Sequence, residues 1–227
     1  IPSGINATTG KVQGAPIRAD ETLTLGVPKI GLLNSESTDY VGRLRVAPEI
    51  GLVNLNETSN LQLNEVEDFS NFPPPRSVNG HKGTFGHIGI VGGSLGYHGA
   101  AVLAARAASR SQPGLVTLMT PEEVFVPVAS QLQSVMVHPL TPKNIEFKLA
   151  TALLIGPGMA AKGLNKDIKE KTNQIWHDSP MPILVDASAL DWIPTGEITS
   201  KSIRVIIPHP GEAARLLDCT SADIQAD

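Results

Sequence analysis

The pattern of apolar and polar positions along the chain changes most clearly near residue 80. From residue 81 onward, short continuous apolar runs alternate with longer segments of helical character. The apolar runs predict the strands Ile88–Val91, Leu115–Leu118, Ala152–Ile155, Ile183–Val185 and Val205–Ile207. The segments between them predict the helices Ala100–Ser109, Glu122–Ser130, Asn165–His177 and Glu212–Leu217. Continuous apolar strands that alternate with helices predict an α/β fold, a mostly parallel sheet with helices on both faces.

The first 53 residues follow a different pattern. Two short β-like runs, Thr22–Leu25 and Arg43–Val46, are punctuated by glycine and proline, and no long amphipathic helix appears. Asn, Glu and Ser then dominate until three consecutive prolines form a stiff spacer. We therefore predict three parts, which are the tail of a larger domain at 1–53, a linker at 54–75 and the α/β domain at 76–227.

Composition and charge narrow the classes of protein that fit this chain. Its 227 residues suffice for one large domain, or for a domain and part of another, and a hydrophobic content of 41% suits a globular core. The net charge of −4 provides no basic footprint for nucleic acid. No apolar run approaches the roughly 20 residues of a membrane helix. We therefore expect neither nucleic acid nor a membrane as a partner.

Cysteine usage and the chain ends add further expectations. The single cysteine, Cys219, excludes an internal disulfide and is compatible with a reducing compartment, so we expect a cytoplasmic protein. The sequence begins at Ile1 without a methionine and ends without an obvious finishing element, so we expect a fragment. No zinc site is predicted, because Cys219 has no metal-ligand spacing with the histidines His81, His87, His98, His138 and His177.

Glycine, proline or polar residues follow four of the predicted strands. The segments are Gly92-Gly93-Ser94, Gly156-Pro157-Gly158, Asp186-Ala187-Ser188 and Pro208-His209-Pro210-Gly211-Glu212. Because the carboxyl ends of parallel strands meet at one edge of a sheet, we expect these segments to line a shared crevice, where α/β proteins bind ligands.

The loop Gly92–Gly99 joins a buried strand to an Ala-rich segment of high helix propensity. Backbone N–H groups in such a loop point at an anion, so we predict a nucleotide or phosphate ligand at Gly93 and Ser94. The alternative is a tight turn without a ligand. The loop is not a Rossmann fingerprint, because no G-x-G-x-x-G opens it, and it is not a P-loop, because Lys82 precedes the strand instead of following the glycines. Lys82 either reaches back to a phosphate or is a solvated surface lysine.

Three further residues each have a functional and a structural interpretation. The glycines around Pro157 let a ligand approach the backbone at Gly158, or they form an ordinary loop. His209, held between two prolines, hydrogen-bonds a ligand or moves a proton, or else it caps the loop. Asp186 binds a ribose or a metal, or it stabilises the turn.

Together these motifs resemble a known family. The segments His81–Gly114, Gly156–Gly158, Asp186–Leu190 and Pro208–Glu212 are similar to the ADP/ATP-dependent NAD(P)H-hydrate dehydratases, which have a ribokinase-like α/β fold. The first part of the chain resembles the C-terminal end of the Rossmann-like NAD(P)H-hydrate epimerase domain, in Ile1–Gly4, Ala19–Thr24 and Pro28–Gly31. The order is that of the bifunctional repair enzymes, with the epimerase first and the N-terminal part of the dehydratase second.

The resemblance implies repair of a damaged cofactor. Water adds to the nicotinamide ring of NADH or NADPH, and the hydrate is inactive. The epimerase interconverts the R and S hydrates, and the dehydratase restores the dinucleotide from the S epimer at the expense of ADP or ATP. Hydrated NADH or NADPH is then the partner, K+ belongs to the epimerase domain, and Mg2+ is compatible with the nucleotide. The oligomeric state stays open, a homo-oligomer included.

The resemblance also assigns residues. Ser3 matches the serine of the epimerase motif D-I-P-S-G, which helps to hold potassium. Ala100, Gly158 and His209 match positions that touch the hydrated dinucleotide. The nucleotide and its phosphates are assigned to Lys82, Gly93 and Ser94 on the residue pattern described above, not on the resemblance.

Some family motifs are missing or altered in this sequence. The aspartate of D-I-P-S-G, the upstream epimerase loop, the nucleotide segment K-G-x-x-T and the catalytic aspartate of G-S-G-D all fall outside it. We therefore assign no catalytic residue and expect the chain to be inactive alone. Ser188 stands where the family has a second aspartate, Gln112 and Pro113 replace a Gly-Ala pair, and Ile207 replaces a common threonine. The Gln112–Pro113 change puts the helix-to-strand turn in question.

Two other functions fit the same pattern. A vitamin-type kinase of the ribokinase-like class shares the fold, but an epimerase-like front end is not expected there; phosphorylation of a small alcohol would support it. A non-catalytic nucleotide-binding module predicts ligand binding without product.

Overall fold

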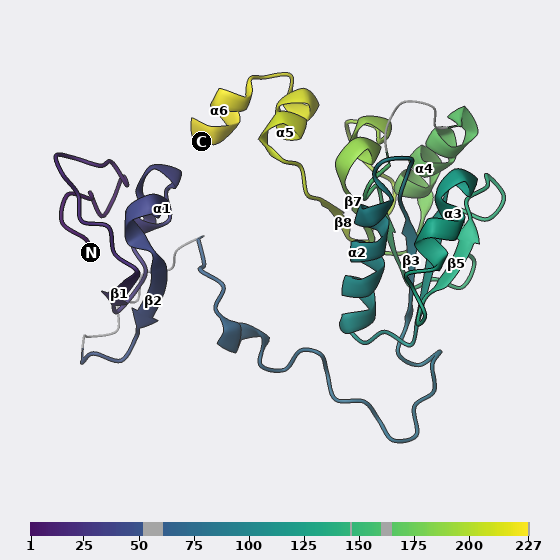
Figure 1. The fold of residues 1–227 in the computed structure, drawn as a ribbon, viewed down its shortest axis with the longest axis horizontal. Helices are drawn as coiled ribbons and strands as arrows, with labels where there is room; N and C mark the ends of the chain where they lie inside the picture. The colour runs from purple at the N-terminus through teal and green to yellow at the C-terminus, as the bar shows by residue number, and fades with distance from the viewer. Residues whose placement is uncertain (52–60, 146, 160–164, 227) are drawn as a thin grey trace. The chain divides into compact units, whose positions relative to one another are not determined.

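The computed structural model describes residues 1–51, 61–145, 147–159 and 165–226, which belong to two compact units (Figure 1). The first unit comprises Ile1–Ser70 and the second Asn71–Asp227. The division falls within the predicted linker 54–75, part of which lies outside the described residues. No helix in the described ranges is long and apolar enough to cross a membrane.

The first unit contains a small β-α-β arrangement. Strand β1 (Glu21–Leu25) pairs in parallel with β2 (Arg43–Ala47), and α1 (Ser35–Val41) connects them after the short helix η1 (Ile30–Leu32). The β-like runs predicted here are confirmed, whereas α1 was not predicted. Its seven residues are too few for a clear periodic signal, but Asn34 caps it by accepting a hydrogen bond from the Glu36 N–H. A second short helix, η2 (Val66–Phe69), ends this unit.

The second unit is built on a parallel sheet, as the sequence predicts. Its six described strands lie in the order β5-β4-β3-β6-β7-β8, and every neighbouring pair is parallel. Their bounds are β3 His87–Val91, β4 Leu115–Thr120, β5 Met136–Pro139, β6 Ala152–Ile155, β7 Ile183–Val185 and β8 Arg204–Ile206. Strand β5 was not predicted. It lies at the sheet edge, has only four residues and ends in proline, so it lacks the continuous apolar run of the inner strands.

Helices cover both faces of this sheet (Figure 1). On one face, α2 (His98–Arg110) and α3 (Glu122–Ala129) pack on a core that includes Ile90 and Leu118. On the other, α4 (Lys166–Asp178) and η3 (Ala187–Trp192) pack on a core that includes Val91 and Ile155. Helices α5 (Pro210–Leu217) and α6 (Ser221–Ala226) follow β8. The fold class is therefore confirmed, with aliphatic residues forming most of both cores.

The turn between α2 and β4 forms despite its unusual residues. Gln112 occupies the left-handed region with φ +60°, where glycine would be unstrained. The guanidinium of Arg76 donates to the carbonyls of Gln112 and Pro113, at 2.6 and 3.0 Å. These bonds hold the turn in a conformation that its own sequence disfavours, so the Gln-Pro pair adds strain without preventing the connection.

Candidate functional site

The chain reverses its direction of winding between the two central strands of the second unit. From β3 it proceeds through β4 to β5 on one side, and from β6 through β7 to β8 on the other. In open α/β sheets, ligands bind outside the carboxyl ends of the strands at such a switch point. The segments that leave these two ends are Gly92-Gly93-Ser94 after β3 and Gly156-Pro157-Gly158 after β6.

These two segments are hydrogen-bonded to each other. The Gly93 N–H donates to the Pro157 carbonyl at 2.8 Å, and the Ser94 hydroxyl donates to the Gly158 carbonyl at 2.7 Å. We call residues 92–94 and 156–158, together with the first turn of α2, the switch-point rim. Because both bonds use backbone groups of a glycine-containing loop, the rim is held as one unit.

Gly93 and Gly158 both occupy places that no other residue fits. Gly93 has φ +88°, and a Cβ there would lie 2.7 Å from the Thr120 hydroxyl oxygen. Gly158 has φ +71°, and its Cβ would lie 2.3 Å from the Tyr97 carbonyl oxygen and 3.0 Å from the Ala100 Cβ. Gly158 therefore packs directly against the start of α2. Among the predicted site residues, the structure brings together Gly93, Ser94, Ala100 and Gly158.

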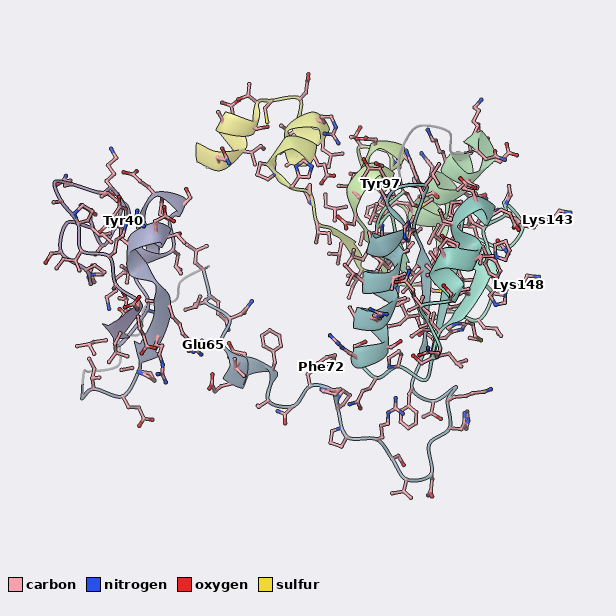
Figure 2. All side chains as sticks on the ribbon, viewed as in Figure 1. Tyr40, Glu65, Phe72, Tyr97, Lys143 and Lys148 are labelled. Carbon is pink, nitrogen blue, oxygen red and sulfur yellow. The ribbon has the colours of Figure 1, made fainter. Side chains whose placement is uncertain are left out.

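The start of α2 is open to an anion. Tyr97 occupies the N-cap position without a side-chain cap, and the first turn carries no acidic residue (Figure 2). The first N–H groups of a helix have no partner within it, and the helix dipole places partial positive charge there. Gly99 and Ala100 add almost no side-chain bulk over these groups. The rim therefore fits a phosphate or another anionic group.

Thr120 is a rim neighbour that the sequence analysis did not single out. Its side chain is completely buried at the end of β4, and its hydroxyl has no hydrogen-bond partner in the described part of the chain. It lies directly beside Gly93. Ligands of parallel sheets bind at the carboxyl ends of the strands, and Thr120 is the last residue of β4, so the same rule applied to β4 would have identified it from the sequence.

Residues 92–96 also match the G-x-S-x-G pattern of a hydrolase nucleophile elbow. The Ser94 hydroxyl, however, donates its proton to the Gly158 carbonyl. Ser94 is also not among the residues with positive φ, although the elbow is a strained turn. The geometry therefore assigns Ser94 to the connection between the two loops, and not to nucleophilic attack.

His209 follows β8 at the same edge of the sheet and caps α5. The ring Nδ1 of His209 accepts a hydrogen bond from the Gly211 N–H at 3.1 Å. The backbone N–H of His209 donates to the Glu212 carboxylate at 2.9 Å. The acceptor role of Nδ1 places the ring proton on Nε2, which lies 3.4 Å from the other Glu212 oxygen. The structural interpretation of His209 is thus realised. The ring is 65% exposed, which leaves its predicted ligand contact open to test.

Lys82 lies away from the rim. It precedes β3, and its carbonyl packs against Gly114 just before β4, at the amino edge of the sheet. The five residues of β3, about 17 Å of strand, separate it from Gly93, which is further than a lysine side chain reaches. The glycine-rich segment around Lys82 therefore closes the amino edge, and the solvated-lysine interpretation fits its exposed position.

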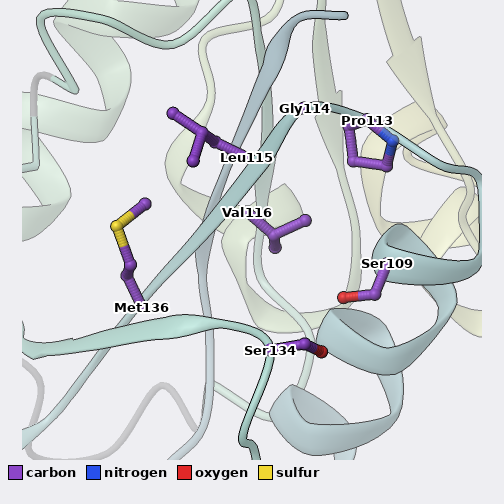
Figure 3. A pocket seen from close by; sticks show the side chains of 7 residues that line it. All are labelled: Ser109, Pro113, Gly114, Leu115, Val116, Ser134 and Met136. Carbon is purple, nitrogen blue, oxygen red and sulfur yellow. The ribbon is translucent and has the colours of Figure 1, made fainter. Parts of the chain in front are cut away.

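A small cavity of about 240 Å³ also lies at the amino edge (Figure 3). It is lined by Ser109, Pro113, Gly114, Leu115, Val116, Ser134 and Met136, residues at the end of α2 and the starts of β4 and β5. Because ligands of parallel α/β sheets bind at the carboxyl ends of the strands, we do not assign the ligand to this cavity.

The shifted pKa values belong to groups outside the rim. Burial lowers the pKa of His87 at the start of β3, with the Leu149 backbone opposing the effect, and burial also lowers the pKa of Arg204 at the start of β8. Hydrogen bonds from the hydroxyl and then the N–H of Thr220 lower the pKa of Asp223.

The predicted metals were tested against the residues present. In the described ranges, no group of three or more His, Cys, Asp or Glu side chains could hold a metal ion. Ser3 is exposed in the first unit, and its carbonyl accepts a hydrogen bond from the Ile17 N–H at 3.2 Å. One hydroxyl does not make a potassium site, so we derive no step through K+ or Mg2+.

Comparison with protein families and curated relatives gives a consistent match. A family model described as NAD(P)H-hydrate dehydratase matches residues 88–227. The bifunctional NAD(P)H-hydrate repair enzyme Nnr of Escherichia coli (strain K12) is 36% identical over 231 residues, which cover 100% of this chain and 44% of the relative. The Nnr enzyme of Dictyoglomus turgidum is 33% identical and covers 96% of the chain and 45% of its own length. The chain thus spans less than half the length of these relatives.

Solved structures give a further match. The ADP/ATP-dependent NAD(P)H-hydrate dehydratase of Bacillus subtilis, co-crystallised with ATP/Mg2+, has a TM-score of 0.61 at 25% identity and covers 71% of this chain and 57% of its own. A hypothetical protein of Streptococcus mutans, SMU.573, has a TM-score of 0.56 at 28% identity, covering 65% and 55%.

Proposed function

The chain belongs to the NAD(P)H-hydrate dehydratase family, and from this premise we propose that its switch-point rim binds the hydrated dinucleotide. The observation that carries the proposal is the hydrogen-bonded pair of loops, Gly93 to Pro157 and Ser94 to Gly158, beside the uncapped start of α2. This arrangement supplies close backbone approach and the N–H groups of a helix start without a side-chain cap, which suit a molecule with a pyrophosphate.

In this proposal the chain's residues bind and orient, and a nucleotide supplies the phosphate. The N–H groups of the first turn of α2, beside Gly93 and Ser94, stabilise phosphate charge as it develops, so that the ring hydroxyl leaves more easily. Ala100, Gly158 and His209 contact the hydrated dinucleotide. Lys82 takes a structural role at the amino edge, where its backbone meets Gly114.

The whole protein is proposed to be a bifunctional repair enzyme. Its curated relatives carry that name, and this chain covers 44% and 45% of two of them. Residues 1–53 are proposed as the end of the epimerase domain, with Ser3 near a potassium ion, and residues 76–227 as part of the dehydratase. ADP or ATP as the donor and a cytoplasmic location belong to the same proposal.

A titration of the chain with hydrated NADH tests the proposal. Isothermal calorimetry should detect binding by the wild type and a loss of at least tenfold in affinity for Gly158→Ala, because the new methyl group would overlap the Tyr97 carbonyl. Gly196→Ala is the matched control, since Gly196 also has positive φ, +119°, but nothing within 4 Å. Absence of binding to a folded wild-type chain would refute the proposal.

Addition of ADP to the same samples tests whether the chain catalyses dehydration of hydrated NADH. Return of the dihydronicotinamide absorbance would show that the residues of this chain suffice for dehydration, contrary to the expectation that the catalytic aspartate lies outside them. Phosphorylation of a vitamin alcohol, without any effect on hydrated NADH, would favour the kinase alternative.

A further inference from the structure

Asp186 directly follows β7, and its carboxylate makes no contact that stabilises the fold within the described residues. It occupies the N-cap position of η3, where an aspartate normally accepts a hydrogen bond from the helix, yet its side chain makes no capping bond. The caps at Asn34, Asn165 and His209 all do. Within the described residues, the Asp186 carboxylate has neither a hydrogen-bond partner nor an ion-pair partner. The turn-stabilising interpretation of Asp186 is therefore unsupported.

The backbone nevertheless holds Asp186 firmly beside the rim. The Asp186 N–H donates to the Ile155 carbonyl at 3.0 Å. The Asp186 carbonyl oxygen packs against Gly156, so that a Cβ on residue 156 would lie 1.8 Å from this oxygen. The next residue, Ala187, has φ +53°, a left-handed conformation that alanine disfavours. Strained backbone of this kind is concentrated at ligand-binding sites, where surrounding structure maintains it.

The strand order places Asp186 between two predicted ligand contacts. β7 lies between β6, which leads to Gly158, and β8, which leads to His209. Two strand spacings, about 10 Å, separate β6 from β8, so a ligand that contacts both Gly158 and His209 crosses the end of β7. The part of the ligand that meets Asp186 must be a hydrogen-bond donor, because a carboxylate repels phosphate.

We propose that the Asp186 carboxylate accepts hydrogen bonds from the vicinal hydroxyls of a ribose in the bound dinucleotide. This inference rests on the proposed function, because the sugar belongs to the hydrated substrate. Both riboses of hydrated NADH present the same pair of vicinal hydroxyls. Asp186 is thus a specificity-determining contact for a sugar, and it lies between the switch-point rim and the N-terminal cap of α5.

Calorimetric titration of Asp186→Asn and Asp186→Ala with hydrated NADH, in metal-free buffer, tests the inference. Because a hydrogen bond to a charged group is lost, affinity should fall about tenfold to a hundredfold in both variants. Asp191→Asn is the control, since Asp191 lies in the same helix η3 but pairs with Arg215 at 3.3 Å. Thermal unfolding of each variant verifies that the sheet is intact.

Two further ligands identify the ribose. Hydrated reduced nicotinamide mononucleotide contains only the nicotinamide-side sugar, so an equal loss with this ligand places Asp186 there. If the mononucleotide binds wild type and variants equally, while hydrated NADH binds the variants more weakly, Asp186 contacts the adenosine sugar. Hydrated NADPH should then bind the wild type more weakly than hydrated NADH, because its 2′-phosphate would meet the carboxylate.

The outcomes separate this inference from the proposed function. If folded wild type binds no hydrated NADH, the proposed function fails. If wild type binds and both Asp186 variants bind equally well, only the ribose contact is refuted. A loss of affinity that appears solely when Mg2+ is added would also overturn it, because the carboxylate would then hold a cation rather than a sugar.

Discussion

The buried hydroxyl of Thr120, beside the switch-point rim, lowers the stability of the second unit because it lacks a hydrogen-bond partner within the described residues. The side chain is 0% exposed and its oxygen has no partner among the residues that the structure describes. A buried unsatisfied polar group costs about 1–3 kcal/mol. Gly93 lies against this oxygen, which explains why residue 93 cannot carry a side chain.

Thr120→Val should therefore stabilise the second unit by about 1 kcal/mol, because valine has a similar shape and no hydroxyl. Urea unfolding followed by circular dichroism measures the change. The same replacement at Thr172, whose buried hydroxyl donates to the Ile168 carbonyl, is the control and should not stabilise. A destabilised Thr120→Val protein would show that the hydroxyl has a partner, such as a bound water.

His87 makes the stability depend on pH. Burial lowers its pKa below the ordinary value of 6.5, so the unfolded chain binds more protons than the folded chain in this range. Its contribution to the free energy of unfolding is complete above pH 6.5 and is lost as the pH falls below that value toward the lowered pKa. In His87→Gln this part of the pH dependence should disappear, as urea unfolding on both sides of pH 6.5 can measure. An unchanged pH profile would assign the effect to other groups.

At the scale of elements, the α2–β4 turn shows a local conflict that tertiary contacts resolve. A left-handed conformation costs Gln112 about 1–2 kcal/mol, whereas the greater freedom of glycine in the unfolded chain costs about 0.4–1 kcal/mol. Gln112→Gly should thus stabilise by up to about 1 kcal/mol. The Arg76 bonds use backbone carbonyls and survive the change.

Thermal or urea unfolding tests this prediction. At the exposed helical residue Gln174, the same replacement should destabilise by about 1 kcal/mol, because glycine weakens a helix interior. Opposite signs at the two glutamines are the expected result. Destabilisation at both positions would mean that the Gln112 side chain contributes more than its backbone strain costs.

The cap of α5 allows stability and ligand binding to be separated at His209. His209→Ala removes the bond from the Gly211 N–H and should destabilise by about 1 kcal/mol. His209→Asn should retain stability, because asparagine is a strong capping residue. If His209 also contacts the hydrated dinucleotide, the Asn variant will unfold like the wild type and still bind the ligand more weakly. Equal affinity in the Asn variant would restrict His209 to the structural role.

At the scale of the whole molecule, the sequence predicted the sheet because its inner strands are continuous apolar runs. The same rule missed β5, which is short, half-exposed and polar at His138. The meeting of Gly93 with Gly158 followed from the general behaviour of parallel sheets. The hydrogen bonds between the two loops, from Gly93 to Pro157 and from Ser94 to Gly158, could not be predicted, because they depend on loop conformations that no local pattern encodes.

Individual site residues were harder to place than the fold. Sequence neighbours do not share an edge of the sheet: Lys82 and Gly93 are close in the chain, yet β3 separates them. The cap at His209 depends on the side chain of Glu212 and was one of two open interpretations. The unused carboxylate of Asp186 became visible only when its capping bond proved to be missing.

The bond between Ser94 and Gly158 joins residues 64 positions apart, and the partner loops come from strands that meet only in the assembled sheet. The switch-point rim therefore forms only when β6 pairs with β3, and a chain without that pairing lacks the proposed binding surface. Amide exchange at Gly93 should accordingly be slowed whenever the two loops are paired, because its proton is held in the bond to the Pro157 carbonyl.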